Sequence, residues 1–104
     1  MNRYEEAVKR VLEQFCREFT GRDSGWQVET WLHPTTRSVR SVTVVPEFSR
    51  LGKSERLNLL FDYLRAHLST EDFVHLSLAM ALTPDEYEHT DWRPTEVELV
   101  AAAR

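Results

Sequence analysis

The sequence has one cysteine, three glycines and no long apolar run. A single cysteine, Cys16, cannot form an internal disulfide, which is typical of proteins that fold in a reducing compartment. No apolar stretch approaches the roughly 18 residues that a membrane-spanning helix needs. The polar residues 1–6 also differ from a secretory signal peptide. We therefore expect a cytoplasmic protein that does not contact a membrane.

The scarcity of glycine also argues against the common phosphate-binding loops. Neither the G-x-x-x-x-G-K-[ST] nor the G-x-G-x-x-G pattern occurs, and Gly52-Lys53-Ser54 matches only the end of the first one. No G-x-S-x-G nucleophile motif is present. Cys16 adjoins an apolar helix face, which favours a buried, unreactive thiol. The histidines lack the spacing of a zinc site, so we expect no enzyme and no cofactor bound by the chain alone.

The net charge of −4 is distributed unevenly along the 104 residues. Residues 33–67 carry a net charge of +3, and residues 68–104 carry −6. In the basic part, Arg50, Lys53 and Arg56 lie around an expected helix start, where basic groups suit phosphate contacts. The acidic end would repel a polyanion. We therefore expect any binding of nucleic acid through these three residues to be weak.

Apolar periodicity and capping residues predict the order of the elements. A helical stripe runs from Tyr4 to Phe19, and Gly21 suits its C-cap. Alternating residues 26–32 and 38–45 predict two strands of a hairpin. A second helical stripe over 57–68 follows Ser54 as N-cap. The strongest strand pattern covers 73–82, and Thr83 opens a capping box for a short helix.

The predicted fold class is α+β, in the order α-β-β-α-β-α, with a three-stranded mixed sheet and helices packed on one face. The second and third strands should be parallel, because a helix connects them. In the third strand, the series Val74, Leu76 and Leu78 should face the helices, and His75 should face away. We expect a single domain over residues 1–92. Residues 93–104 would form a C-terminal extension, with a short helix over 95–103.

The second half of the chain resembles BolA-like proteins. The first matching segment is a valine-rich strand with its turn, Val44-Val45-Pro46-Glu47-Phe48, and the second is a helix start with Arg56, Leu60 and Phe61. The third is a strand with His at its second position, Val74-His75-Leu76-Ser77-Leu78, and the fourth is the Thr-Pro-acidic segment Thr83-Pro84-Asp85-Glu86-Tyr87. The resemblance covers residues 42–87 and implies a type II KH-like fold. The chain departs from the family at Arg56-Leu57-Asn58, where the family has Arg-His-Arg, and at Arg50, where it has glycine. Its first strand-connecting loop is also shorter.

The resemblance implies a non-enzymatic binding or regulatory module. Family members pair with monothiol glutaredoxins around a shared [2Fe–2S] cluster, and His75 aligns with the family's cluster-binding histidine. His33 is a loose candidate for a second ligand, since neutral imidazole suits such a cluster. Two alternatives stay open: a diverged interaction or homodimerisation domain without cluster or nucleic-acid binding, and a nucleic-acid-binding transcriptional regulator.

Overall fold

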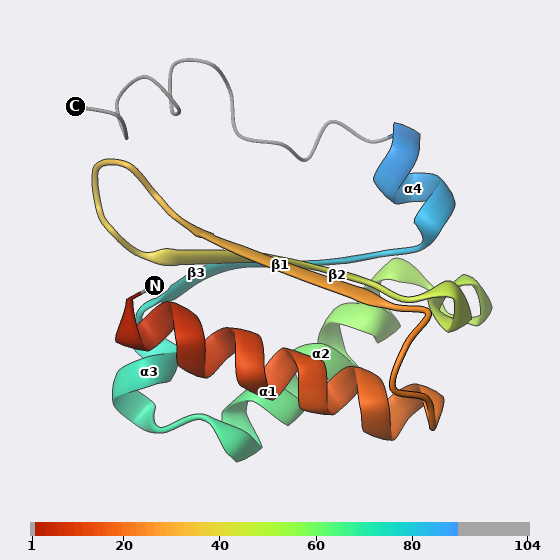
Figure 1. The fold of residues 1–104 in the computed structure, drawn as a ribbon, viewed down its shortest axis with the longest axis horizontal. Coiled ribbons are helices and arrows are strands. Elements are labelled where there is room, and N and C mark those ends of the chain that lie inside the picture. Colours follow the sequence, from red (N-terminus) through yellow and green to blue (C-terminus); the bar gives the residue numbers. More distant parts are fainter. Residues whose placement is uncertain (1, 90–104) are drawn as a thin grey trace.

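A computed structural model describes residues 2–89 and gives an α+β fold, as predicted (Figure 1). The elements in chain order are α1 (Arg3–Thr20), β1 (Gln27–Leu32), β2 (Val39–Val44), the 3₁₀ helix η1 (Pro46–Arg50), α2 (Lys53–His67), α3 (Thr70–Val74), β3 (Leu76–Leu82) and α4 (Pro84–His89). Helices α1, α2 and α3 lie on one side of the sheet, and α4 lies beyond the other side. The predicted extension over 93–104 and its helix lie outside the described residues. Between residues 2 and 89, no helix has the length and apolar character needed to cross a membrane.

The first helix is capped at both ends, of which only the C-cap was predicted. The side chain of Asn2 accepts hydrogen bonds from the backbone N–H groups of Tyr4 and Glu5, which have no partner inside the helix. At the other end Gly21 adopts a left-handed conformation with φ of 73°, which glycine reaches without steric cost. The predicted apolar stripe is buried against the sheet and α2, including Val8, Leu12 and Phe15.

The sheet has the order β1-β2-β3, with β1 and β2 antiparallel and β2 and β3 parallel. The parallel pair is joined through α2, as the crossover prediction requires. Beneath the sheet, α2 buries Leu60 and Leu64, both 0% exposed, against Phe48 and the residues of α1. The N-cap of α2 is Gly52 rather than the expected Ser54, because the carboxylate of Glu55 accepts a hydrogen bond from the Gly52 N–H.

The third strand starts later than predicted and its side chains alternate in a different phase. Residues 70–74 form the short helix α3, so His75 is its C-cap and not a strand residue. The register between β2 and β3 shifts by one residue, from Val39 opposite Leu76 to Arg40 opposite Leu78, which leaves Ser77 as an extra residue. A bulge of this kind moves every later side chain to the other face.

The predicted inward face of β3 is therefore wrong beyond the bulge. Ala79 and Ala81, at 5% and 8% exposure, belong to the core under the helices. Leu78, Met80 and Leu82 are half-buried and lie on the opposite face, where β2 contributes Val42 and Val44. Val74, which was also expected to face the helices, is 68% exposed.

Candidate functional site

The His75 side chain is held in place by contacts from α1 and α3. Its Nδ1 lies 2.8 Å from the carbonyl oxygen of Glu71, and its ring stacks on Tyr4 with a centroid separation of 3.7 Å and an interplanar angle of 7°. The backbone is fixed as well, since the Val39 N–H donates to the His75 carbonyl at 2.7 Å. Because a carbonyl oxygen can only accept, Nδ1 carries the proton in the neutral ring. The lone pair is then on Nε2, the arrangement of a metal-binding histidine.

Tyr4 and Glu71, the two residues that contact the His75 imidazole, also contact each other. The Tyr4 hydroxyl donates to Oε1 of Glu71 at 2.8 Å, and Arg3 pairs with Oε2 of the same carboxylate at 3.4 Å. The hydrogen bond to Glu71 raises the pKa of Tyr4, and partial burial adds to the shift. The resemblance alone pointed to His75, and the stacking partner at the start of α1 was missed. Tyr4 had been interpreted only as an apolar position of the helix, and no local pattern links it to a residue 71 positions away.

His33 lies at the same end of the sheet as His75 but is arranged differently. The His33 N–H donates to the Ser38 carbonyl, and the sheet register sets Leu32, Val39 and Leu76 side by side. The two histidine backbones are thus two strand spacings apart, roughly 10 Å. Nδ1 of His33 accepts from the N–H groups of Thr35 and Thr36, both at 3.2 Å.

The described part of the chain does not contain a complete set of metal ligands. Within residues 2–89, no group of three or more His, Cys, Asp or Glu side chains could hold a metal ion. Cys16, the other strong ligand type, is 0% exposed, and burial raises the pKa of its thiol to about 12. Of the two predicted ligands, His75 is the one whose Nδ1 contact with a carbonyl leaves the Nε2 lone pair able to bind a metal ion.

The three predicted phosphate-binding residues differ in their exposure to solvent. Arg50 and Lys53 lie exposed at the end of η1 and the start of α2. Arg56 is buried at 6% exposure, and its guanidinium donates to the carbonyl oxygens of Phe48 at 2.9 Å and Leu51 at 3.2 Å. A phosphate would have to compete with these partners and with a carboxylate.

That carboxylate belongs to Glu86 in α4. Nη1 of Arg56 lies 2.5 Å from Oε1 of Glu86, and the same oxygen accepts from the Thr83 N–H at 2.8 Å. The predicted capping box is present, since the Glu86 N–H donates back to the Thr83 hydroxyl oxygen at 3.2 Å. The Thr83 N–H, followed by Arg56, lowers the pKa of Glu86 although partial burial opposes the shift. The Arg56–Glu86 ion pair links the start of α2 to α4 near the C-terminal end of β3.

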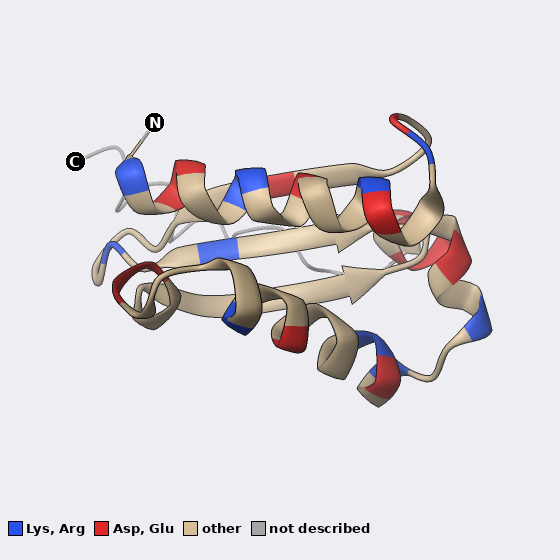
Figure 2. Cartoon of the chain, turned by 90° about the horizontal axis from the view of Figure 1, so that it is seen from below, with Lys and Arg blue, Asp and Glu red and all other residues tan. Residues whose placement is uncertain are grey.

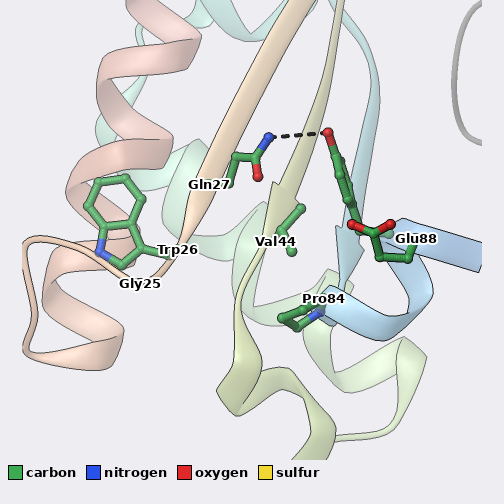
Figure 3. A pocket seen from close by; sticks show the side chains of 7 residues that line it. Gly25, Trp26, Gln27, Val44, Pro84 and Glu88 are labelled. Atoms are coloured by element: carbon green, nitrogen blue, oxygen red, sulfur yellow. Dashed lines mark hydrogen bonds between the residues drawn. The ribbon is translucent and has the colours of Figure 1, made fainter.

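Two hollows flank the end of the sheet. One, of about 260 Å³, lies between the start of β1 and α4 and is lined by Trp26, Val44 and Tyr87 among others (Figure 3). The Tyr87 hydroxyl donates to Glu29 at 2.8 Å and accepts from Gln27 at 3.2 Å across this hollow. The other, of about 280 Å³, runs between the outer edge of β3 and the first turns of α2.

Comparison of the chain with family models, curated proteins and solved structures gives no match.

Proposed function

We propose that the protein is a non-catalytic, cytoplasmic binding module of the BolA-like kind. In this proposal His75 contributes one ligand to a [2Fe–2S] cluster that is held jointly with a monothiol glutaredoxin. The partner's thiolates would supply the other protein ligands, and the cluster would supply its redox and transfer chemistry to the pair.

The observation that carries the proposal is the way the His75 ring is held. The Glu71 carbonyl fixes the tautomer at 2.8 Å and the Tyr4 ring fixes the plane, so Nε2 is available without a rearrangement. Preorganisation of this kind lowers the entropic cost of binding. His75 is half-buried at the end of α3, and residues 2–89 hold no complete metal site of their own. A single well-oriented ligand suits a site that two proteins complete.

The proposal is tested with a glutaredoxin partner. Co-expression of the full chain with a monothiol glutaredoxin should give a complex whose visible absorption and circular dichroism differ from those of the glutaredoxin homodimer. The His75→Ala variant should abolish that difference, because the cluster loses its ligand from this chain.

The chain offers a matched control in His67. Its ring stacks on Tyr63 at 3.9 Å, and its Nδ1 contacts the carbonyl oxygen four residues earlier at 2.9 Å. His67 thus has the local geometry of His75 but is exposed at the end of α2. The His67→Ala variant should keep the spectrum of the wild-type complex. An unchanged spectrum in His75→Ala, or equal losses in both variants, would remove the cluster role.

A further inference from the structure

The outer edge of β3 presents backbone groups that the described residues leave unpaired. The Leu82 carbonyl accepts from Val45, the residue after β2, at 3.0 Å. The Ala81 carbonyl points the other way and accepts from Arg56 at 3.4 Å. Alternation along the strand then directs the N–H and C=O of Ala79 and the N–H of Ala81 away from β2. No further strand lies beyond β3 in residues 2–89.

Beyond the bulge at Ser77, this edge lacks the usual protection against pairing with another chain. Edge strands are commonly blocked by charged side chains, proline or bulges. After the bulge at Ser77, the five residues Leu78–Leu82 are uncharged and apolar and include no proline. The opposite edge of the sheet differs, because β1 carries Glu29 and its Thr30 hydroxyl is bonded to Glu5 of α1. β3 is therefore the edge open to strand addition.

A groove lies along the outer edge of β3. The small side chains of Ala79 and Ala81 leave the hollow of about 280 Å³ between β3 and α2, and Leu57 forms its α2 wall. Leu57 is 36% exposed, so part of its apolar side chain faces solvent beside the groove. The Arg56–Glu86 pair closes the groove at the C-terminal end of β3.

The two ends of the edge carry opposite charges. Lys53 lies at the groove and has no ion-pair partner among residues 2–89. At the N-terminal end of β3, α3 carries Asp72 and Glu71, of which Glu71 already pairs with Arg3, and no basic residue. The last residue of α3 is the exposed Val74. A two-fold axis perpendicular to an antiparallel strand pair superposes the basic end of one copy on the acidic end of the other.

We propose that a second copy of this chain pairs with β3 through its own β3, antiparallel about a two-fold axis at Ala79. The two Ala79 residues then form a hydrogen-bonded pair, and Ala81 of each copy lies opposite Ser77 of the other. The same axis directs Leu57 toward Val74 of the second copy and Lys53 toward its α3. The result is one continuous six-stranded sheet with self-complementary apolar and charged contacts.

The test measures the mass of the full chain in solution over a range of concentrations by sedimentation. The wild type should show a reversible monomer–dimer equilibrium. Leu57→Glu should raise the dimer dissociation constant roughly tenfold or more, since it places a carboxylate in an apolar contact beside the acidic α3 of the other copy. Leu57→Lys should weaken the dimer less, because its charge is opposite to that of α3.

Leu59→Glu is the matched control on the same helix. Leu59 is 42% exposed but does not line the groove, so its substitution should leave the dissociation constant unchanged. Ala79→Pro is a second, independent variant: it removes an N–H that faces away from β2 and should give a monomer. Circular dichroism shows for each variant whether the fold is retained.

A wild type that stays monomeric at every concentration would overturn the proposal. So would equal weakening by Leu57→Glu and Leu59→Glu, or a dimer that survives Leu57→Glu and a folded Ala79→Pro. The His75 side chain stacks on Tyr4 of α1 and its residue precedes β3, so it makes none of the proposed strand contacts. The His75→Ala variant should therefore still dimerise, which separates this proposal from the cluster role.

Discussion

At the scale of single residues, Arg56 and Glu86 connect segments that the sequence does not link visibly. The capping box from Thr83 to Glu86 is a local pattern and could be predicted from four consecutive residues. The ion pair with Arg56 joins residues 30 positions apart, so no spacing rule reveals it. Arg56 was interpreted as one of three basic groups around a helix start that suit phosphate contacts. Its burial depends on the carbonyls of Phe48 and Leu51, which only the folded chain brings to it.

This arrangement predicts how acid destabilises the protein. The pKa of Glu86 is lowered from its ordinary value of 4.5, so its contribution to stability is present above that value and is lost as pH falls through the lowered pKa. Glu86→Gln leaves the Arg56 charge buried without its partner, and should reduce the free energy of unfolding by about 2–4 kcal/mol at neutral pH. The variant should also lose less stability than the wild type on acidification below about pH 4.5.

Denaturant unfolding at a series of pH values measures both effects. Asp85→Asn is the matched control on the same helix, since the Asp85 side chain is 88% exposed and, among residues 2–89, pairs only with His89. It should change the free energy of unfolding by no more than about 0.5 kcal/mol. A Glu86→Gln variant as stable as the wild type would show that the pair contributes no net stability.

At the scale of elements, the order and pairing of the strands followed from the sequence, but the phase of β3 did not. Periodicity and caps identify α1, the hairpin, α2 and the crossover because each is a local or near-local signal. The bulge at Ser77 arises where β3 pairs with β2, a contact between distant residues. The five residues of α3 are too few for a helical period, so the apolar alternation of 73–82 concealed them.

The bulge gives a direct test of the two phases. In an unbroken strand, Ser77 and Ala79 would share one face, and an aspartate at either position would have a similar effect. With the bulge, Ser77 is exposed and Ala79 is 5% exposed in the core. Ala79→Asp should lower the free energy of unfolding by about 3 kcal/mol or more, because it buries an unpaired charge. Ser77→Asp should cost about 1 kcal/mol or less, for lost hydroxyl hydrogen bonds.

Thermal and denaturant unfolding of the two variants distinguishes these cases. Equal free energies of unfolding for the two variants would contradict the shifted register and would support a strand that alternates without a bulge.

At the scale of the whole molecule, the charge distribution bears on the nucleic-acid alternative. The helical side of the protein carries basic and acidic residues in alternation along α1 and α2, without a continuous basic stripe (Figure 2). The net charge is −4, and of the three residues predicted to contact phosphate only Arg50 and Lys53 are exposed. Nucleic-acid-binding surfaces instead concentrate basic groups on one face.

Titration of the full chain with labelled duplex and single-stranded nucleic acid at physiological salt should therefore detect little binding. With two exposed basic groups in the predicted patch, few counterions can be released, and the affinity should depend only weakly on salt. Arg50→Ala and Lys53→Ala should leave the weak signal almost unchanged, and Arg37→Ala, outside the patch, is the matched control. The opposite result would be a sub-micromolar, strongly salt-dependent affinity that Arg50→Ala or Lys53→Ala removes while Arg37→Ala does not. That outcome would place a phosphate-binding surface at the start of α2, because only a specific cluster of basic groups can bind a polyanion against the net negative charge of the chain.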